Sequence, residues 1–324
     1  MGDVFLSIRG RVLINVEALN MTESIGNYVK HRRVPVVLPG TYVTYFVPAI
    51  SGESLAHGYQ SVLAEEATKK GLPACKLCRE GIFLKSTNES VFREAFGVDP
   101  PQDDFEFEKH VIGNCIVEDV GGFLFAPAGA RRNVKRTSNF FVGYMIPTRE
   151  SLEAAVIEPQ LHSRYALGTP FVRREDQQAE RAGGQMIYYV ELSSAVYTFS
   201  FDLDTRFIGK TAFVYGKVGT EVDDKRKLRI EASLDALVKF VTEMMFGAKK
   251  TRFLPVVEWE SLVAAVSDDV WTIPSPFSKD YIAKAEEKVK KVNHNTSIFK
   301  YEGGPGLEAV LEDAVEEAKR RIGT

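Results

Sequence analysis

The sequence predicts an α+β fold of ferredoxin-like type, with an antiparallel sheet and helices on one of its faces. The first observation is the order of the elements: β-branched and aromatic stretches alternate with amphipathic ones as strand, helix, long excursion, strand, helix, strand. The second is that no internal repeat is present, which argues against a solenoid. The chain has 324 residues, of which 44% are hydrophobic, and this is ample material for a core.

The first part of the chain predicts two strands and a helix. Residues 5–16 are rich in Val, Ile and Leu, and residues 41–50 (TYVTYFVPAI) are β-branched and aromatic, as is typical of strands. Residues 21–35 between them are predicted to form a polar loop. A helix start follows at residues 51–53, and one helical face then carries Leu55, Tyr59, Val62 and Leu63.

The second part predicts two more strands and three helices. Residues 186–202 (MIYYVELSSAVYTFSFD) give the strongest strand signal of the chain, and residues 252–266 are strand-like again. Apolar residues at helical spacing predict a helix over 228–246. Two further helices, over 280–292 and 306–322, close the chain.

Two segments differ in character from this core. Residues 73–115 contain a Cys pair, Pro100-Pro101 and an acidic patch, so we expect an insertion outside the main core. Residues 148–184 are polar, with mixed charge and several Pro and Gly residues. They predict a long mobile loop or a small subdomain.

Composition narrows the class of protein. The net charge of −3 argues against a histone-like coat for nucleic acid, but the charges are segregated along the chain. Residues 30–33 and 131–136 are basic, whereas 99–108 and 308–317 are mainly acidic. No apolar run approaches the roughly 20 residues of a membrane span, and the start of the chain lacks the regions of a signal peptide. We therefore expect a cytoplasmic protein.

The stretch 119–147 carries the most informative chemistry. Within it a Gly- and Ala-rich loop bears four cations without an acidic residue among them, Arg131, Arg132, Lys135 and Arg136. Glycines let backbone amides approach a phosphate, and the hydroxyls of Thr137 and Ser138 add donors. The run Lys30–Arg33 taken alone is equally compatible with a solvated surface. Two such loops beside one predicted sheet favour nucleic-acid binding, mostly through the backbone, because the RNA-stacking motif of common RNA-binding sheets is absent.

An enzymatic alternative has less support. The chain lacks hydrolase, P-loop and zinc-protease motifs, and its five histidines are widely spaced. A ribonuclease that uses His31 and His57 as acid and base is conceivable, since both lie near a basic loop. No catalytic residue is assigned, and no cofactor is required.

A metal site is a separate possibility. Cys75-x-x-Cys78, with His110 and Cys115 further along, has the ligand types of one structural zinc site. The alternative is a set of incidental thiols in a reducing compartment. Three cysteines are too few for a disulfide framework.

Seven segments in order carry a resemblance to a known family. They are 23–27 (ESIGN), 30–32 (KHR), 50–57 (ISGESLAH), 119–123 (DVGGF), 143–147 (GYMIP), 191–199 (ELSSAVYTF) and 252–255 (RFLP). Together they resemble the archaeal subtype I-A backbone subunit of the CRISPR Cascade surveillance complex, the DevR-like autoregulator family. The Cys75 and Cys78 pair is not a hallmark of that family.

The resemblance implies a division into structural parts. An RRM-like palm would comprise residues 1–72, 116–147 and 186–266, with a finger-like insertion at 73–115 and a thumb loop at 148–184. A C-terminal helical segment, residues 267–324, would pack on the palm.

The resemblance also implies a non-enzymatic function. Such a subunit polymerises along a CRISPR guide RNA (crRNA), holds its backbone and presents the bases, so that target DNA pairs with the guide in short segments. Its partners would be the guide RNA, target DNA through pairing, other copies of itself and other Cascade subunits. The alternatives are a metal-independent RNA endonuclease that processes repeat RNA and a DNA-binding autoregulator. The residues expected to bind RNA are Asn27, Lys30, His31, Arg32, Ser51, Arg131, Arg132, Lys135, Arg136, His162 and Arg164.

Overall fold

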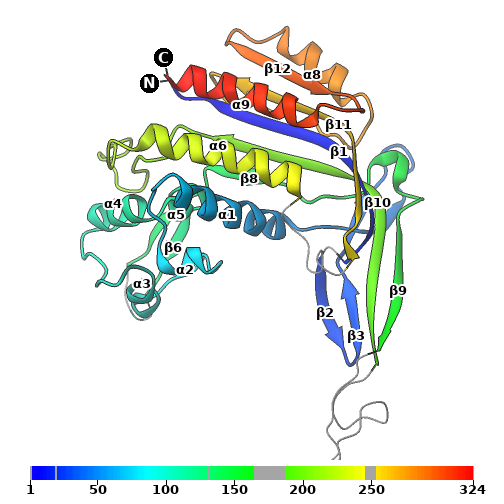
Figure 1. Ribbon diagram of the computed structural model, residues 1–324, viewed down its shortest axis with the longest axis horizontal. Helices are drawn as coiled ribbons and strands as arrows, with labels where there is room; N and C mark the ends of the chain where they lie inside the picture. Colours follow the sequence, from blue (N-terminus) through cyan, green and yellow to red (C-terminus); the bar gives the residue numbers. More distant parts are fainter. Residues whose placement is uncertain are drawn as a thin grey trace, which may run out of the picture.

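The longest strand, β10 (Ile187–Asp204), organises the sheet (Figure 1). It pairs with β1 (Phe5–Glu17) in antiparallel register, from Phe5 opposite Asp204 to Glu17 opposite Ser193. Its first half also pairs with β9 (Val156–Ser163), and its last residues pair with β8 (Phe140–Val142). The structure is a computed structural model that describes residues 2–18, 20–127, 129, 132–163, 187–244 and 253–323.

The main sheet has eight strands and is mostly antiparallel. Its path runs β12-β11-β1-β10-β3-β2, with β8 and β9 both on β10. Among the strand pairings described for this sheet, only the short pairing of β3 with β10 is parallel. The remaining strands of this sheet are β2 (Met21–Ile25), β3 (Tyr28–His31), β11 (Val256–Ser267) and β12 (Thr296–Tyr301). Two small sheets pair β4 (Arg33–Val37) with β5 (Thr44–Pro48) and β6 (Phe123–Phe125) with β7 (Val134–Arg136).

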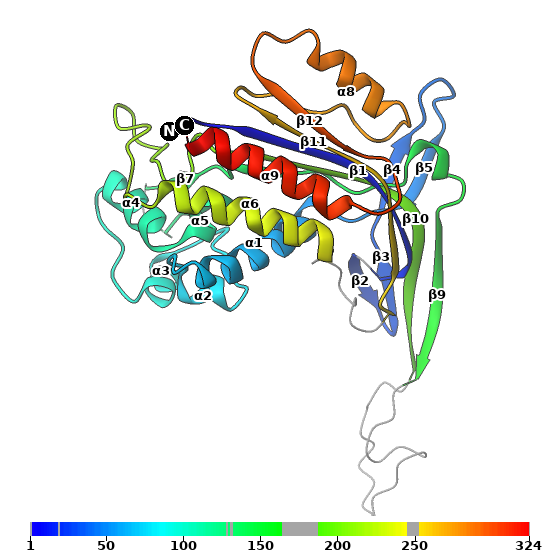
Figure 2. The same cartoon turned by 45° about the horizontal axis from the view of Figure 1, so that its top comes forward.

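Helices cover both faces of the sheet, so the prediction that they lie on one face is wrong. On one face lie α1 (Gly52–Lys69), α6 (Arg226–Glu243) and α9 (Leu307–Gly323), while α8 (Tyr281–Val289) lies on the other (Figures 1 and 2). The alternation along β11 explains this arrangement, because Leu262 and Ala264 join the cluster of the first face, whereas Val263 joins that of α8. Among the described helices we find none with the length and apolar character needed to span a bilayer.

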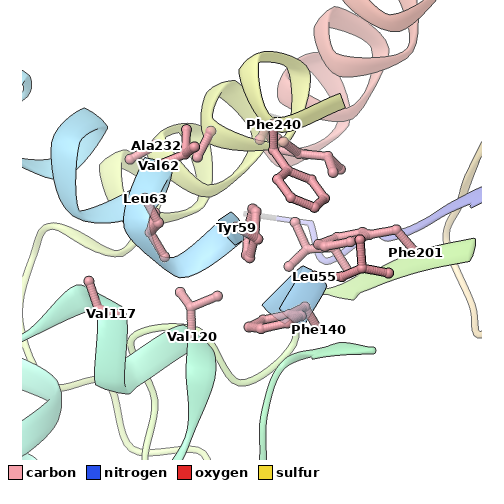
Figure 3. Packing of buried hydrophobic residues seen from close by; sticks show 14 of the residues in the cluster. Leu55, Tyr59, Val62, Leu63, Val117, Val120, Phe140, Phe201, Ala232 and Phe240 are labelled. Atoms are coloured by element: carbon pink, nitrogen blue, oxygen red, sulfur yellow. The ribbon is translucent and has the colours of Figure 1, made fainter. Parts of the chain in front are cut away.

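The centre of the core is the side chain of Tyr59 in α1 (Figure 3). Its ring meets Phe140 and Phe201 of the sheet edge-on, at 4.8 and 4.9 Å between centroids, and Phe240 of α6 at 6.0 Å. Its hydroxyl donates to the carbonyl of Ser233 at 3.0 Å, so the one polar atom of this buried ring is satisfied. The apolar face of α1 that the sequence predicts therefore packs between α6 and the sheet.

The segment 73–115 is helical, and its buried apolar residues join the main apolar cluster instead of forming a separate core. It forms α2 (Lys76–Arg79), α3 (Glu89–Phe96) and α4 (Asp104–Asn114), and α5 (Ile116–Gly121) follows. Phe92, Phe107 and Cys115 are buried in the same apolar cluster as Tyr59. The reason is that α1 holds two neighbours: α5, which packs on α4, and α2, which packs on α3.

Other predictions of the elements are confirmed, with three corrections. Strands β1, β5, β10 and β11 and helices α1, α6, α8 and α9 lie where the patterns place them. Residues 21–35, however, form β2, β3 and part of β4 instead of a loop. Residues 156–163 of the predicted thumb loop form β9, while residues 164–184 of it lie outside the described residues. The C-terminal segment adds β12 to the sheet between its two helices.

Candidate nucleic-acid interface

The described cations of the glycine-rich stretch belong to a small hairpin, β6 and β7, which we call the basic hairpin. Along β7, Val134 and Arg136 are buried whereas Lys135 between them is exposed, as strand alternation requires. Gly122, with φ +73°, lets the hairpin start there, since a Cβ atom at that position would lie 2.5 Å from the carbonyl oxygen of Arg136. Arg131 lies outside the described residues.

Arg136 is buried in a set of ion pairs, which disfavours the predicted contact with RNA. Its guanidinium lies 2.5 Å from Asp119 Oδ1 of α5 and 3.3 Å from Glu108 Oε1 of α4. It also donates to the carbonyls of Phe207 and Lys210, at 2.6 and 2.8 Å. With a side chain only 1% exposed and its donors engaged, it is not accessible to a ligand.

The two carboxylates that hold Arg136 also hold the loop at 207–213. Glu108 accepts from the backbone amides of Ala212 and Phe213, at 2.7 and 3.1 Å, and Asp119 accepts from Gly209 at 2.9 Å. Burial raises the pKa of Asp119, and the neighbouring guanidiniums of Arg136 and Arg229 oppose that shift. We call Arg136, Asp119, Glu108 and Arg229 the buried charge network.

Beside this network lies a shallow pocket with an exposed cation, which we call the Lys135 pocket. Its lining includes Lys135, the hydroxyl residues Thr137 and Ser138, and the rings of Phe141 and Phe213. The ring of Phe141 is 48% exposed, so its face is open to a ligand. A cation, hydroxyl donors and an aromatic face are the groups that bind a single-stranded nucleic acid. Asp204 also lines the pocket, but its carboxylate is paired with Arg206 at 2.5 Å.

Arg132 is only partly available. Its Nε donates to Asp104 at 2.6 Å, and its Nη1 donates to the carbonyl of Pro101 at 2.9 Å. The guanidinium also lies over the ring of Phe107, 5.4 Å from its centroid, and the side chain is 21% exposed. Arg132 therefore fastens the basic hairpin to α4, and a contact with a ligand would compete with that role.

A second group of predicted residues lies on a projection formed by β2, β3, β9 and the first half of β10, which we call the strand arm (Figure 1). Asn27 is exposed in the β2–β3 turn and donates to the carbonyl of Ile187 at 3.2 Å. Lys30 on β3 is 41% exposed and pairs with Glu23 at 3.2 Å. His162 of β9 stacks on Tyr188 of β10 with centroids 5.3 Å apart. Arg164 lies outside the described residues.

The strand arm and the basic hairpin lie at opposite ends of the molecule in both views (Figures 1 and 2). A compact site for one ligand group therefore cannot include both. An extended strand of several nucleotides is the kind of ligand that reaches from one to the other.

His31 and Ser51 are buried, which disfavours their predicted contacts with RNA. His31 Nε2 lies 3.0 Å from Ser193 Oγ, and its Nδ1 lies 2.9 Å from the carbonyl oxygen of Arg32. Burial lowers the pKa of His31, so its ring is neutral at pH 7, and a ring engaged at both nitrogens offers no free base for catalysis. Ser51 caps α1, and Asn20 Oδ1 accepts from its amide at 2.7 Å. Arg32, which is half-buried, donates to the same oxygen at 3.0 Å.

The predicted zinc ligands are brought together only in part. The sulfur atoms of Cys75, Cys78 and Cys115 lie within 4.8 Å of one another and are buried. The ring of His110 instead packs against Phe92 and Phe96, at 5.7 and 5.4 Å between centroids. It does not belong to the cysteine group that the described residues form, so the predicted ligand set is wrong in its histidine.

The sequence matches the family described as CRISPR-associated negative auto-regulator DevR/Csa2 over residues 8–286. The chain belongs to the DevR/Csa2 family. This confirms the family that the seven ordered segments indicate. The match runs from β1 through α8, so it includes the strand arm, the basic hairpin and the buried charge network.

Relatives within and around the DevR/Csa2 family agree with this assignment. The chain is 37% identical over 302 residues to CRISPR-associated protein Cas7/Csa2 1 of Saccharolobus solfataricus, which covers 92% of this chain and 89% of that protein. It is 39% identical over 281 residues to CRISPR-associated aCascade subunit Cas7/Csa2 2 of the same organism, with 84% and 82% covered. A chain of a solved CRISPR RNA-guided surveillance complex, pre-nicking, has a TM-score of 0.50 at 10% identity, with 97% of this chain and 99% of that chain covered. At that identity the likeness concerns the fold alone.

The buried charge network predicts a large loss of stability on substitution of Arg136. In Arg136→Ala the carboxylates of Asp119 and Glu108 lose a buried cation, which we expect to lower the free energy of unfolding by about 3–5 kcal/mol. Urea denaturation measures it. Lys135→Ala, one residue away but exposed, is the matched control and should change the free energy by less than about 0.5 kcal/mol. Equal, small effects of both substitutions would contradict the role assigned to the network.

The buried His31 predicts a dependence of stability on pH. Below its ordinary pKa of 6.5 the unfolded chain takes up a proton at His31 before the folded chain does. The contribution of His31 is therefore complete above pH 6.5 and is lost as the pH falls towards the lowered pKa, by at most about 1.4 kcal/mol per pH unit. His31→Gln should flatten the unfolding free energy between pH 7 and pH 5.5. His57→Gln, at an exposed position, should leave the slope unchanged, and a slope unaffected by His31→Gln would refute the assignment.

Proposed function

We propose that this chain binds the backbone of a CRISPR guide RNA, polymerises along it in a type I Cascade-like antiviral complex, and presents it for pairing with target DNA. The observation that carries the proposal is membership of the DevR/Csa2 family over most of the chain, with a 39% identical relative that is itself an aCascade subunit. The Lys135 pocket and the strand arm supply the chemistry for a single strand.

The arrangement suits a ligand that is held by its backbone. The exposed ammonium of Lys135 and the hydroxyls beside it suit a phosphate, and the ring of Phe141 suits a sugar or a base face. Lys30 and Asn27 offer a second group of contacts at the far end of the molecule. If base pairing reads the sequence of the target, the protein needs only these sequence-independent contacts.

The proposed division of labour follows the fold. The RRM-like palm is assigned to 1–72, 116–147 and 186–266, the finger to 73–115 and the thumb to 148–184. In this assignment β9, one of the strands of the strand arm, is the first part of the thumb, and it would reach towards a neighbouring copy along the guide. The segment 267–324 adds α8, β12 and α9 to the palm sheet.

The chain is proposed to act without catalysis. The described histidine with the most suggestive position, His31, is buried and engaged at both ring nitrogens, which disfavours the RNA endonuclease alternative. The family name favours a second candidate, a DNA-binding autoregulator. Such a regulator would bind duplex DNA with sequence preference, whereas a guide-binding subunit retains single-stranded RNA of any spacer sequence.

Guide binding should depend on Lys135. In Lys135→Ala we expect the affinity for crRNA to fall several-fold for all spacer sequences alike, and the slope of log K against log salt to shrink by about 0.7 for one lost phosphate contact. Filter binding at several salt concentrations measures both. Lys290→Ala, which removes an exposed lysine from the end of α8, is the control.

Three outcomes would count against the proposal. Unchanged affinity and slope in Lys135→Ala would remove Lys135 from the interface. Preferred binding of duplex DNA with a defined sequence would support the autoregulator, and cleavage of repeat RNA by the purified chain would support the endonuclease. Sequencing of nucleic acid that co-purifies with the wild type should give short RNAs of uniform length with shared flanks.

A further inference from the structure

All three cysteines of the chain meet in one buried cluster beneath α1. Cys75, Cys78 and Cys115 come from two separate places in the sequence, and their sulfur atoms lie within 4.8 Å of one another. Each residue is at most 5% exposed. Free cysteines are common in cores as single small apolar side chains, but three convergent sulfur atoms form a set of metal ligands.

The local structure aims these sulfur atoms at one point. Cys75 caps the short helix α2, and its Sγ accepts from the amide of Cys78 at 3.5 Å, so the two thiols of the C-x-x-C motif lie on the same side. Cys115 stands at the junction of α4 and α5. The amide of Ile116 donates to the carbonyl of Pro73 at 2.9 Å, which fixes the two segments against each other.

Glu118 of α5 offers a carboxylate beside Cys78, although its oxygens do not lie within 4.8 Å of all three sulfur atoms. The Oε1 atom of Glu118 accepts from Cys78 Sγ and from the amide of Leu84, both at 2.9 Å. Its other oxygen, Oε2, is buried and has no hydrogen-bond donor among the residues that the structure describes. Glu118 is 0% exposed. An unsatisfied carboxylate oxygen in an apolar interior is costly, so it is an independent indication that a cation belongs beside it.

We propose that Cys75, Cys78, Cys115 and Glu118 bind one structural zinc ion. Tetrahedral zinc with Zn–S bonds of about 2.3 Å holds sulfur atoms about 3.8 Å apart, so on binding the three sulfur atoms would move closer together and the carboxylate of Glu118 would turn towards them. Binding of Zn²⁺ releases the protons of the three thiols and leaves a site with a charge of −2. Lys85, whose Nζ donates to the carbonyl of Gly121 at 3.0 Å, interacts electrostatically with Glu118 and Cys78 and offsets part of this charge.

The ion would fasten residues 75–78 to the corner between α4 and α5. Glu118 is adjacent in sequence to Asp119, which pairs with Arg136 under the basic hairpin. Zinc binding would therefore stabilise the base on which Lys135 is presented. The proposal does not depend on the proposed function, because it concerns the fold of one chain.

Metal analysis of the full chain, purified without chelator and with zinc in the growth medium, tests the proposal. We expect one zinc ion per chain, released in step with the three thiols on titration with a mercurial reagent. These are the only cysteines of the chain, so the titration reports on this cluster alone. Cobalt substitution should give an intense thiolate-to-cobalt charge-transfer band and the visible bands of a tetrahedral ion.

Two variants test whether the fourth ligand is Glu118, as proposed here, or His110, as the spacing in the sequence suggests. Glu118→Gln keeps the shape of the side chain and should weaken zinc affinity at least about tenfold, with a change in the visible cobalt spectrum. His110→Ala, the matched control, should retain the ion and the spectrum. Loss of the ion from His110→Ala but not from Glu118→Gln would overturn the assignment of Glu118.

If a variant fails to fold, measurements on the wild type alone still test for the zinc site. A chelator should lower the melting temperature of the wild type, and added zinc should restore it. Metal that stays far below one equivalent after reconstitution with zinc would refute the site. So would three thiols that react at the same rate with and without zinc, or a Cys75–Cys78 disulfide as the stable state.

Discussion

The ion pair between Arg136 and Asp119 is the constraint on which the arrangement around the basic hairpin depends. Two charged side chains that are almost fully buried are tolerated only when nearly all of their hydrogen-bonding atoms have partners. Those partners have to come from several elements of the fold. Asp119 comes from α5, Glu108 from α4, and the remaining acceptors of Arg136 are carbonyls at 207 and 210. The guanidinium of Arg136 needs all of these acceptors. Segment 73–115, the basic hairpin and the loop at 207–213 are therefore held together as one body.

The same constraint explains why Lys135 is exposed. Strand alternation turns successive side chains of β7 to opposite sides, so a strand that buries Arg136 must present Lys135 to solvent. A run of cations in a sequence does not show which of them is buried. Here a fold-stabilising arginine and the exposed lysine that we propose binds the ligand are adjacent in the sequence. The alternation in Val134-Lys135-Arg136 carried that information, but a three-residue strand is too short to be recognised from its pattern.

Helices and strands with long periodic patterns were predictable from the sequence. Short strands, and contacts that depend on pairing across the sheet, were not. The strand 187–204 and the helices 52–69 and 226–243 have enough residues for periodicity to decide. The hairpin of β2 and β3 was missed although its Gly26-Asn27 turn is a known hairpin signal, and Gly26 has φ +60°. β2 is mostly exposed and polar and β3 has only four residues, so no apolar alternation marked them. The position of His31 against Ser193 depends on pairing across the sheet, which a local pattern cannot supply.

The cysteine cluster shows how topology corrects a spacing argument. Counting residues grouped His110 with the cysteines, because histidine is a common zinc ligand and lies close to Cys115 in sequence. In the fold, α4 turns His110 towards Phe92 and Phe96, while the corner after α4 turns Cys115 and Glu118 the other way, towards Cys78. Glu118 and Asp119 are neighbours in one short helix, so one backbone segment joins the cysteine cluster to the buried charge network. The two sets of buried polar groups therefore cannot shift independently, and the position of Lys135 rests on both.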